Sequence, residues 1–337
     1  MESSMKKYAK LITENRTSPH FMYDGKKSGL IVDPSDGSVP VDIIGFGAYQ
    51  LEDGPFEFES EKREMVFIPI DGEFRLTTGG KTFSGGRKGG QFDQLPRKSN
   101  ISAVYVPPAS SIRLEGEGEM VFFTAPATPG NPSVQVNAED AKLIAAGAGF
   151  WRRDFLILVS PDRISKNLTA GETYSPAGHW SGTPLHVHDK HDPEHGQSDH
   201  EEVYYHRFRL KEGERFGAYG IQLLFDGKEL DKSYIIHDRS VIAIPGGSHP
   251  VVSGPMSDHV YTYALAGREG AALLMLDIPE FKYLKAIGEV LKELEKERGQ
   301  VKISRDRLKD MKALQGFTPF QWKMLENILA ERGFTIL

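Results

Sequence analysis

The chain has 337 residues, of which 39% are hydrophobic and 26% are charged, a composition typical of a soluble globular protein with two domains. Its net charge of −6 argues against a nucleic-acid partner, and the absence of cysteine excludes disulfides, thiolate metal ligands and cysteine nucleophiles. The chain opens without a secretion-type apolar segment and has no run of about 18 apolar residues, so we expect a cytoplasmic protein without membrane association.

Short apolar runs separated by turns fill the chain after residue 28. Residues 64–70 and 73–78 flank Asp71 and Gly72, a pair typical of a β-hairpin turn. Further strands are predicted over residues 103–106, 119–123, 151–159, 204–208, 221–225, 241–244 and 259–265. Many short strands at close spacing favour an all-β fold, either a sandwich or a barrel.

Residues 84–100 form a glycine-rich, basic segment. Its Gly-Gly-Arg-Lys-Gly-Gly sequence is similar to a phosphate-binding loop, but neither a Gly-Lys-Ser/Thr motif nor a helical pattern supports that function. We therefore predict a flexible loop.

Residues 125–150 are rich in proline and alanine and are predicted to link two domains. We expect a first domain over residues 1–145, a second domain over residues 146–277 and a helical tail over residues 278–337. The first domain has no histidine after His20, so we expect it to lack a metal site.

The tail has the periodicity of helices. Apolar residues recur at helical spacing at Leu284, Ile287, Leu291 and Leu294. Ser304 and the Thr318-Pro319 pair are typical of helix N-termini. The charge of the tail is too small to indicate nucleic-acid binding, so we expect the tail to pack on the second domain or on another subunit.

Histidine is concentrated in one part of the chain. Ten of the eleven histidines lie between His179 and His259, and only His20 lies outside this segment. The residues around 183–209 are therefore the first candidates for a functional site.

His186 and His188 are separated by one residue, so in a strand both imidazoles point to the same side. A strand-forming segment with two glutamates, residues 201–208, and a glycine-rich turn that ends at His249 follow. Imidazole and carboxylate ligands suit a divalent metal, and zinc, manganese, iron and nickel all fit this set. The alternative is a histidine-rich loop without a metal, because an isolated His-x-His is common on exposed strands.

These segments resemble the cupin pattern and, more closely, the 5-deoxy-glucuronate isomerase family of bicupins from myo-inositol catabolism. The residues that carry the resemblance are Pro184-Leu185-His186-Val187-His188-Asp189, Glu201-Glu202-Val203-Tyr204-Tyr205-His206-Arg207 and Pro245-Gly246-Gly247-Ser248-His249-Pro250. The resemblance covers residues 28–270 and implies two jelly-roll β-barrels, to which the α-helical C-terminal extension is an addition. It implies that the metal ligands are His186, His188, Glu202 and His249.

The resemblance also implies the reaction. The expected substrate is a small sugar acid, 5-deoxy-D-glucuronate, and the expected product is 5-dehydro-2-deoxy-D-gluconate. A metal acting as a Lewis acid on a carbonyl and its neighbouring hydroxyl favours an enediolate, which is reprotonated at the other carbon in an aldose–ketose isomerisation. This chemistry needs neither a thiol nor a redox cofactor.

Strand alternation places Tyr204 and His206 on the same face as Glu202, so we predict that they serve as acid and base or bind hydroxyl groups; filling of the barrel is the alternative. Arg153 and Arg207 are candidates to bind the substrate carboxylate, although a bulge is needed to turn Arg207 inward.

Two further residues are predicted to contact the substrate. Gln222 lies on a predicted strand and is a candidate to bind a hydroxyl group. Lys190 follows the His-x-His pair and is a candidate to line the mouth of the site.

Three other functions compete with this interpretation. A 4-deoxy-5-keto-uronate isomerase is expected to have a shorter segment than the one between His188 and Glu202. A metal-dependent cupin dioxygenase predicts oxygen consumption, and a non-catalytic sugar-binding cupin predicts no turnover. For the isomerase we expect a homo-oligomer.

Overall fold

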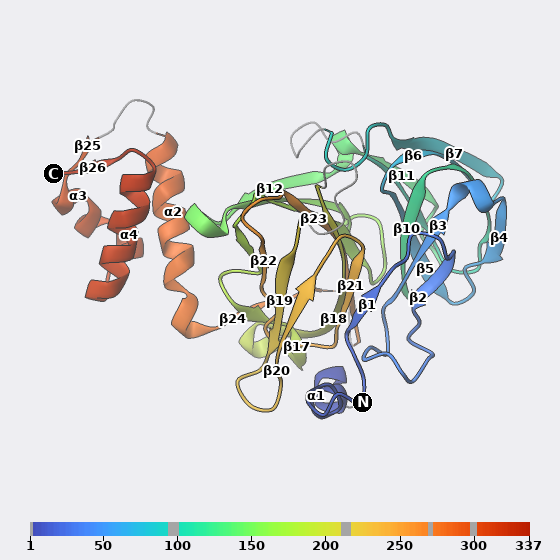
Figure 1. Ribbon diagram of the computed structural model, residues 1–337, viewed down its shortest axis with the longest axis horizontal. Coiled ribbons are helices and arrows are strands. Elements are labelled where there is room, and N and C mark those ends of the chain that lie inside the picture. Colours follow the sequence, from blue (N-terminus) through green and yellow to red (C-terminus); the bar gives the residue numbers. More distant parts are fainter. Residues whose placement is uncertain (1–2, 94–100, 210–216, 269–271, 297–301) are drawn as a thin grey trace.

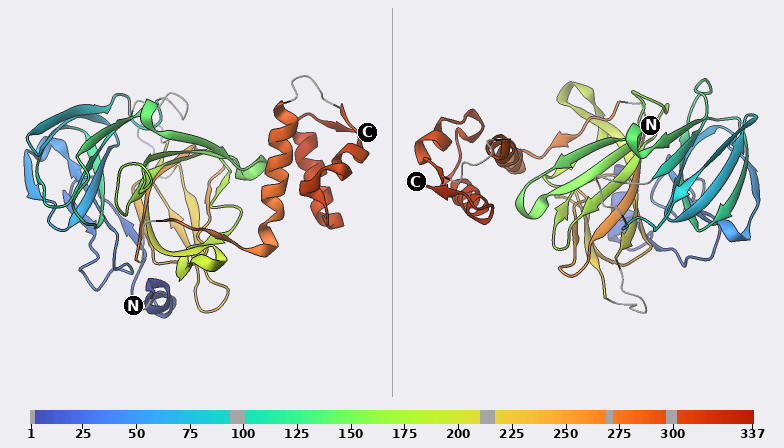
Figure 2. Two further views of the ribbon diagram at one scale, coloured as in Figure 1. Left: turned by 180° about the vertical axis from the view of Figure 1, so that it is seen from behind. Right: turned by 90° about the horizontal axis from the view of Figure 1, so that it is seen from above.

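The computed structural model describes residues 3–93, 101–209, 217–268, 272–296 and 302–337. Two β-rich units lie side by side, and a group of helices lies at the end of the molecule opposite to the first unit (Figures 1 and 2). Strands predominate, which confirms the expectation of a mainly β fold followed by a helical tail.

The first unit contains two antiparallel sheets. A six-stranded sheet has the order β11-β8-β5-β10-β3-β2, and a four-stranded sheet has the order β4-β9-β6-β7. The strands are β2 (Gly29–Val32), β3 (Gly45–Gln50), β4 (Phe56–Glu59), β5 (Arg63–Pro69), β6 (Gly72–Thr78), β7 (Lys81–Arg87), β8 (Ser102–Val106), β9 (Ser111–Glu117), β10 (Glu119–Pro126) and β11 (Val134–Asn137). Large apolar side chains such as Phe67, Phe74 and Phe122 fill the space between these sheets.

The predicted hairpin around Asp71 and Gly72 is wrong. β5 pairs with β8 and β10, whereas β6 pairs with β7 and β9 in the other sheet, so the chain changes sheets at this turn. Gly72 has φ +74°, and a Cβ at this position would lie 2.0 Å from the carbonyl oxygen of Glu117. The crossing therefore requires glycine. The hairpin forms instead between β6 and β7, around Gly79 and Gly80.

The predicted flexible loop over residues 84–100 is also partly wrong, because β7 extends through residue 87. Arg87 at the end of this strand is buried and forms a two-pronged ion pair with Glu172 of the second unit, with both N–O distances at 2.7 Å. Residues 94–100 of the predicted loop lie outside the described residues.

The second unit also contains two main sheets. The larger has the order β1-β21-β18-β23-β14-β13-β12, with β17 paired to β18, and the smaller has the order β15-β22-β19-β20. The strands are β1 (His20–Met22), β12 (Lys142–Ala146), β13 (Arg153–Val159), β14 (Thr169–Ser175), β15 (Trp180–Ser181), β16 (His186–Val187), β17 (Asp189–Asp192), β18 (Gln197–Phe208), β19 (Gly220–Phe225), β20 (Asp231–Ile236), β21 (Ser240–Ile244), β22 (Val251–Ser253), β23 (His259–Gly267) and β24 (Leu276–Asp277).

The beginning of the chain joins the second unit. β1 pairs with β21, and helix α1 (Ser4–Thr13) packs its buried face, including Met5 and Ile12, on the core of the second unit. We predicted a first domain over residues 1–145, but α1 and β1 at the start of this range pack on the second unit. Over the described residues the strand orders of both units are open, so the detail of two closed barrels is not confirmed.

Buried carboxylates connect the two units. Glu64 on β5 accepts the backbone N–H groups of residues 166–168, at 2.8, 2.7 and 2.6 Å. Glu201 on β18 accepts those of residues 42–44, at 2.8, 2.8 and 3.1 Å. Each unit therefore uses one glutamate to satisfy the backbone of a loop in the other, because buried N–H groups need acceptors. Since Glu202 follows Glu201, one strand carries both this contact and a predicted metal ligand.

The tail contains helices α2 (Tyr283–Lys296), α3 (Arg305–Asp310) and α4 (Pro319–Glu331) and the short strands β25 (Lys302–Ile303) and β26 (Thr335–Ile336). The predicted helix caps at Ser304 and Thr318 form. The predicted apolar stripe of α2 is buried in a core that includes Ala148 and Trp151, so the tail packs on the second unit. No helix in the described segments is long and apolar enough to span a bilayer.

Candidate metal centre

Three imidazoles meet inside the second unit. His186 lies on β16, His188 follows it, and His249 lies on the turn between β21 and β22. Their ligand nitrogens all lie within 4.8 Å of one another. Oε2 of Glu202 on β18 lies 3.4 Å from Nε2 of His188 and 3.0 Å from Nε2 of His249. The structure thus brings together all four side chains that the resemblance implied as ligands.

Backbone carbonyls fix the tautomer of each imidazole. Every Nδ1 of the group faces a carbonyl oxygen: His186 with Pro184 at 3.0 Å, His188 with His200 at 3.1 Å and His249 with Gly247 at 2.7 Å. A carbonyl oxygen can only accept, so Nδ1 carries a proton, and in the neutral imidazole Nε2 keeps its lone pair. Nε2 of His188 and of His249 is buried without a hydrogen-bond partner in the described part of the chain. Buried polar atoms of this kind fit metal ligands.

Asp189 connects the two segments that carry the imidazoles. One carboxylate oxygen accepts the N–H of Gly247 at 2.7 Å, and the other accepts the amide of Gln197 at 2.8 Å. A Cβ at Gly246 would lie 2.4 Å from the Cβ of Asp189, so this contact requires glycine. The turn that presents His249 is therefore held against the His-x-His segment.

The protonation states of Glu202 and His186 suit a divalent cation, whereas for His188 the lowering of the pKa by burial is outweighed by Glu202, so this pKa is raised. Burial raises the pKa of Glu202, but the neighbouring His188 and His249 outweigh it and hold this pKa at about 2. Burial, followed by the charges of His249 and His188, lowers the pKa of His186 to about 4. At neutral pH the carboxylate is thus ionised and His186 is neutral, as metal ligands must be. The all-N/O donor set fits zinc, manganese, iron or nickel.

Tyr204 is the next inward-facing residue of β18 after Glu202. Its ring lies 5.9 Å from that of His249 and 4.5 Å from that of Tyr261. Burial and then the charge of Glu202 raise the pKa of Tyr204 well above its usual value, so the phenol is protonated. His206 lies one inward position farther along the strand, and burial lowers its pKa well below the usual value, so it is neutral.

Arg153 lies at the start of β13, close to the tyrosines. It donates to the carbonyl oxygens of Trp151 at 3.2 Å and Thr183 at 2.7 Å. Burial lowers its pKa, while Tyr261 and Tyr204 raise it. Among the described residues, no carboxylate lies within 4.0 Å of its guanidinium. A half-buried cation without a carboxylate partner suits an anionic ligand group.

Arg207 does not lie in the site. Its guanidinium binds Asp238 at 2.8 Å and Glu119 of the first unit at 3.3 Å. The pairing of β18 with β23 runs without a shift from His200 to Phe208, so no bulge turns Arg207 inward.

The other two predicted substrate contacts have different surroundings. Lys190 is exposed and pairs with Asp192 at 2.7 Å, and it lines an outer groove together with Val187. Gln222 is buried beside the centre and donates to the carbonyl oxygen of His249 at 2.7 Å, while its Oε1 has no partner among the described residues.

Sequence reasoning missed three residues of this region: Asp189, Tyr261 and His259. The alternation of His259, Tyr261 and Tyr263 along β23 places all three on one face, and this pattern is visible in the sequence. The partner of Asp189 is a backbone group 58 residues away, for which no local pattern exists.

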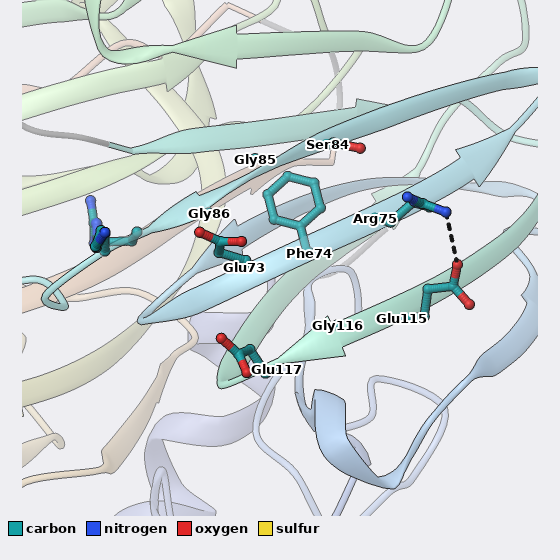
Figure 3. Close-up of a pocket in the computed structure, with 11 residues that line it drawn as sticks. Glu73, Phe74, Arg75, Ser84, Gly85, Gly86, Glu115, Gly116 and Glu117 are labelled. Atoms are coloured by element: carbon teal, nitrogen blue, oxygen red, sulfur yellow. Dashed lines mark ion pairs between the residues drawn. The ribbon is translucent and has the colours of Figure 1, made fainter.

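A groove of about 830 Å³ lies in the first unit, away from the imidazoles (Figure 3). Gly85, Gly86 and Gly116 leave the space above β6, and acidic side chains such as Glu73 and Glu117 surround it. The imidazole cluster and this groove are thus separate features.

The sequence model of the KduI/IolB family matches residues 19–284. The chain belongs to the KduI/IolB family. Curated relatives named 5-deoxy-glucuronate isomerase include those of Listeria monocytogenes, 24% identical over 71% of this chain and 86% of that protein, and Lacticaseibacillus casei, 27% identical over 67% and 80%. The expectation that the chain is an isomerase is confirmed at the level of this family.

Solved structures support the fold. The crystal structure of an IolB-like protein from Salmonella typhimurium LT2 is similar with a TM-score of 0.71 at 22% identity, over 79% of this chain and 98% of that chain. A structure of oxalate decarboxylase, a cupin-fold protein, gives a TM-score of 0.50 at 12% identity, over 82% and 83%. At these identities the likeness concerns the fold alone.

Proposed function

We propose that this member of the KduI/IolB family is a metal-dependent aldose–ketose isomerase that converts 5-deoxy-D-glucuronate into 5-dehydro-2-deoxy-D-gluconate in myo-inositol catabolism. The names of the curated relatives support the reaction and the substrate. The metal dependence is inferred from four potential ligands that lie close together: His186, His188, His249 and Glu202.

Four side chains would hold the metal: the three imidazoles through Nε2, and Glu202 through its carboxylate. A divalent ion supplies Lewis-acid polarisation of a substrate carbonyl when it is bound. The backbone carbonyls at Nδ1 and the clamp of Asp189 fix the ligands in advance, so little reorganisation is needed on binding.

Other residues of this chain orient the substrate and move protons. Arg153 would bind the substrate carboxylate through a charge-assisted pair, since it has no protein carboxylate. Tyr204 is a protonated phenol beside Glu202 and would donate a hydrogen bond or a proton to a substrate oxygen. His206 is neutral and has a lone pair for a proton or a hydroxyl group.

The test combines metal analysis with NMR. Purified protein is expected to contain one divalent metal per chain and, in D₂O, to exchange the C–H proton on the hydroxyl-bearing carbon next to the carbonyl of 5-deoxy-D-glucuronate. His249→Ala should lose both the metal and the exchange, because it removes one ligand of four. His195→Ala is the control and should retain both, because His195 is exposed and paired with Asp192.

Metal-free protein that turns over at the normal rate would refute the proposal. A faster reaction with a 4-deoxy-5-keto uronate would assign the related isomerase, and oxygen consumption in an oxygen electrode would assign a dioxygenase.

A further inference from the structure

Besides the three imidazoles of the candidate metal centre, the second unit contains a pair of imidazoles in contact with each other. Nδ1 of His206 on β18 lies 2.9 Å from Nε2 of His259 on β23, and both side chains are fully buried. The His259 ring stacks on Phe208 with a centroid distance of 4.4 Å and an angle of 6°. The position of His259 is therefore fixed by packing, and it contacts His206 through one nitrogen.

The pair continues a row of rings that starts at the metal centre. The Tyr204 ring lies 5.9 Å from that of His249 and 5.8 Å from that of His206. Phe208 is opposite His259 in the pairing of β18 with β23, so His206 is the member of the pair nearer to Glu202 along the strand. His206 is thus the inward-facing residue of β18 next to Tyr204 on the side away from Glu202.

The protons on the two rings determine which hydrogen-bond donors and acceptors the pair presents to a ligand. Two neutral imidazoles carry one N–H each, and one of these N–H groups lies in the bond between the rings. If His206 donates in that bond, its Nε2 is a bare acceptor; if His259 donates, Nε2 of His206 is a donor. In both cases Nε2 of His206 and Nδ1 of His259 are left buried, and neither has a partner among the described residues.

We propose that Nε2 of His206 binds a hydroxyl group of the polyhydroxy acid held at the metal centre, and that His259 is the positioning residue that sets the tautomer of His206. The identity of the ligand rests on the proposed function. The geometry of the pair does not, because it depends only on the contact between two side chains.

The chemistry of the pair favours a hydroxyl group over a charged group. Burial lowers the pKa of His259 to about 3, so the pair offers no positive charge to an anion at neutral pH. Arg153 is a half-buried cation in this region and suits the carboxylate. Ser175, which is opposite His259 in the pairing of β14 with β23, also has a buried hydroxyl without a partner in the described segments. A hydroxyl group both donates and accepts, so it satisfies either tautomer.

The test uses zinc-loaded full-length protein labelled with ¹⁵N-histidine, with D-glucuronate as the probe. Long-range ¹H–¹⁵N spectra distinguish protonated from bare ring nitrogens. We expect D-glucuronate to shift the signals of Nε2 of His206 and, through the shared bond, those of His259. Succinate, a diacid without hydroxyl groups, should leave them unchanged. These measurements need no turnover, so they remain informative if the proposed reaction is wrong.

Two variants separate positioning from packing. His259→Phe keeps an aromatic ring against Phe208 but removes both nitrogens, and it should weaken D-glucuronate binding about three- to tenfold, the effect of one hydrogen bond. It should also change the tautomer signals of His206 while the zinc content stays at one per chain. Phe208→Leu changes only the packing and should bind D-glucuronate within about twofold of the wild type.

Three results would overturn the proposal: no binding of D-glucuronate by the zinc-loaded wild type, no response of His206 at saturation, or equal losses of affinity in His259→Phe and Phe208→Leu.

Discussion

Glu201 and Glu64 each accept three backbone N–H groups from the opposite unit, and this likeness allows a test of how the candidate metal centre is supported. Their other contacts differ: Glu201 also contacts Ser4 and Arg268, whereas Glu64 accepts the hydroxyl of Tyr105 at 2.9 Å. Both carboxylates are fully buried. Replacing either glutamate with alanine leaves three backbone donors, some buried and some partly buried, without this acceptor. At about 1–3 kcal/mol for each donor, and with some relief by local rearrangement, we expect each variant to lose roughly 3–5 kcal/mol of unfolding free energy.

The two variants should differ in metal binding. Glu201 precedes Glu202 on β18, whereas Glu64 lies on β5 of the first unit and contacts no ligand. Glu201→Ala should therefore weaken zinc binding about tenfold, a typical effect of losing an outer contact of a ligand segment, and Glu64→Ala should leave it unchanged.

Denaturant unfolding of the metal-free variants measures the stability, and calorimetric zinc titration measures the affinity. A loss below about 1 kcal/mol in Glu201→Ala would show that water or the backbone replaces the carboxylate. Equal zinc affinities in the two variants would refute the view that the interface supports the ligand strand.

Three further predictions concern the site. Arg153→Met should raise KM for the sugar acid about 10- to 100-fold, because it removes a charge-assisted pair with the substrate carboxylate. Arg207→Met should lower the stability of the protein and leave KM unchanged. Steady-state kinetics of the two variants tests this difference in KM. Tyr204→Phe should lower kcat about 100-fold at full zinc occupancy, and an unchanged kcat would exclude the phenol from proton transfer. The folded-state pKa values of His200 and His259 are about 4 and about 3, below the unfolded value of 6.5. As pH falls, the unfolded chain therefore binds protons before the folded chain does, so the folded state becomes less stable. Between pH 6.5 and 4 the metal-free protein should lose about 1.4 kcal/mol of unfolding free energy per pH unit for each of the two histidines. Denaturant midpoints that do not change over this pH range would contradict the prediction.

Local sequence patterns were sufficient for several features of this protein. His186 lies on β16 and His188 directly follows this strand, and their separation by one residue predicted that both imidazoles point to the same side. In the tail, the apolar stripe of α2 and the cap at Thr318 were predictable because a helix repeats every 3.6 residues and its first N–H groups need an acceptor.

Only the tertiary structure decided the features that depend on distant partners. Asp71 and Gly72 suit a hairpin and a sheet crossing equally well, and the crossing follows from which strands β5 and β6 find as neighbours. Arg207 has the residue type that binds a substrate carboxylate, but Glu119, 88 residues away, neutralises it at the interface between the units. His259 acquires its contact with His206 only when β23 pairs with β18. Periodicity along the chain determines which side a residue faces, whereas its partner depends on strand pairing and burial between segments that are far apart in the sequence.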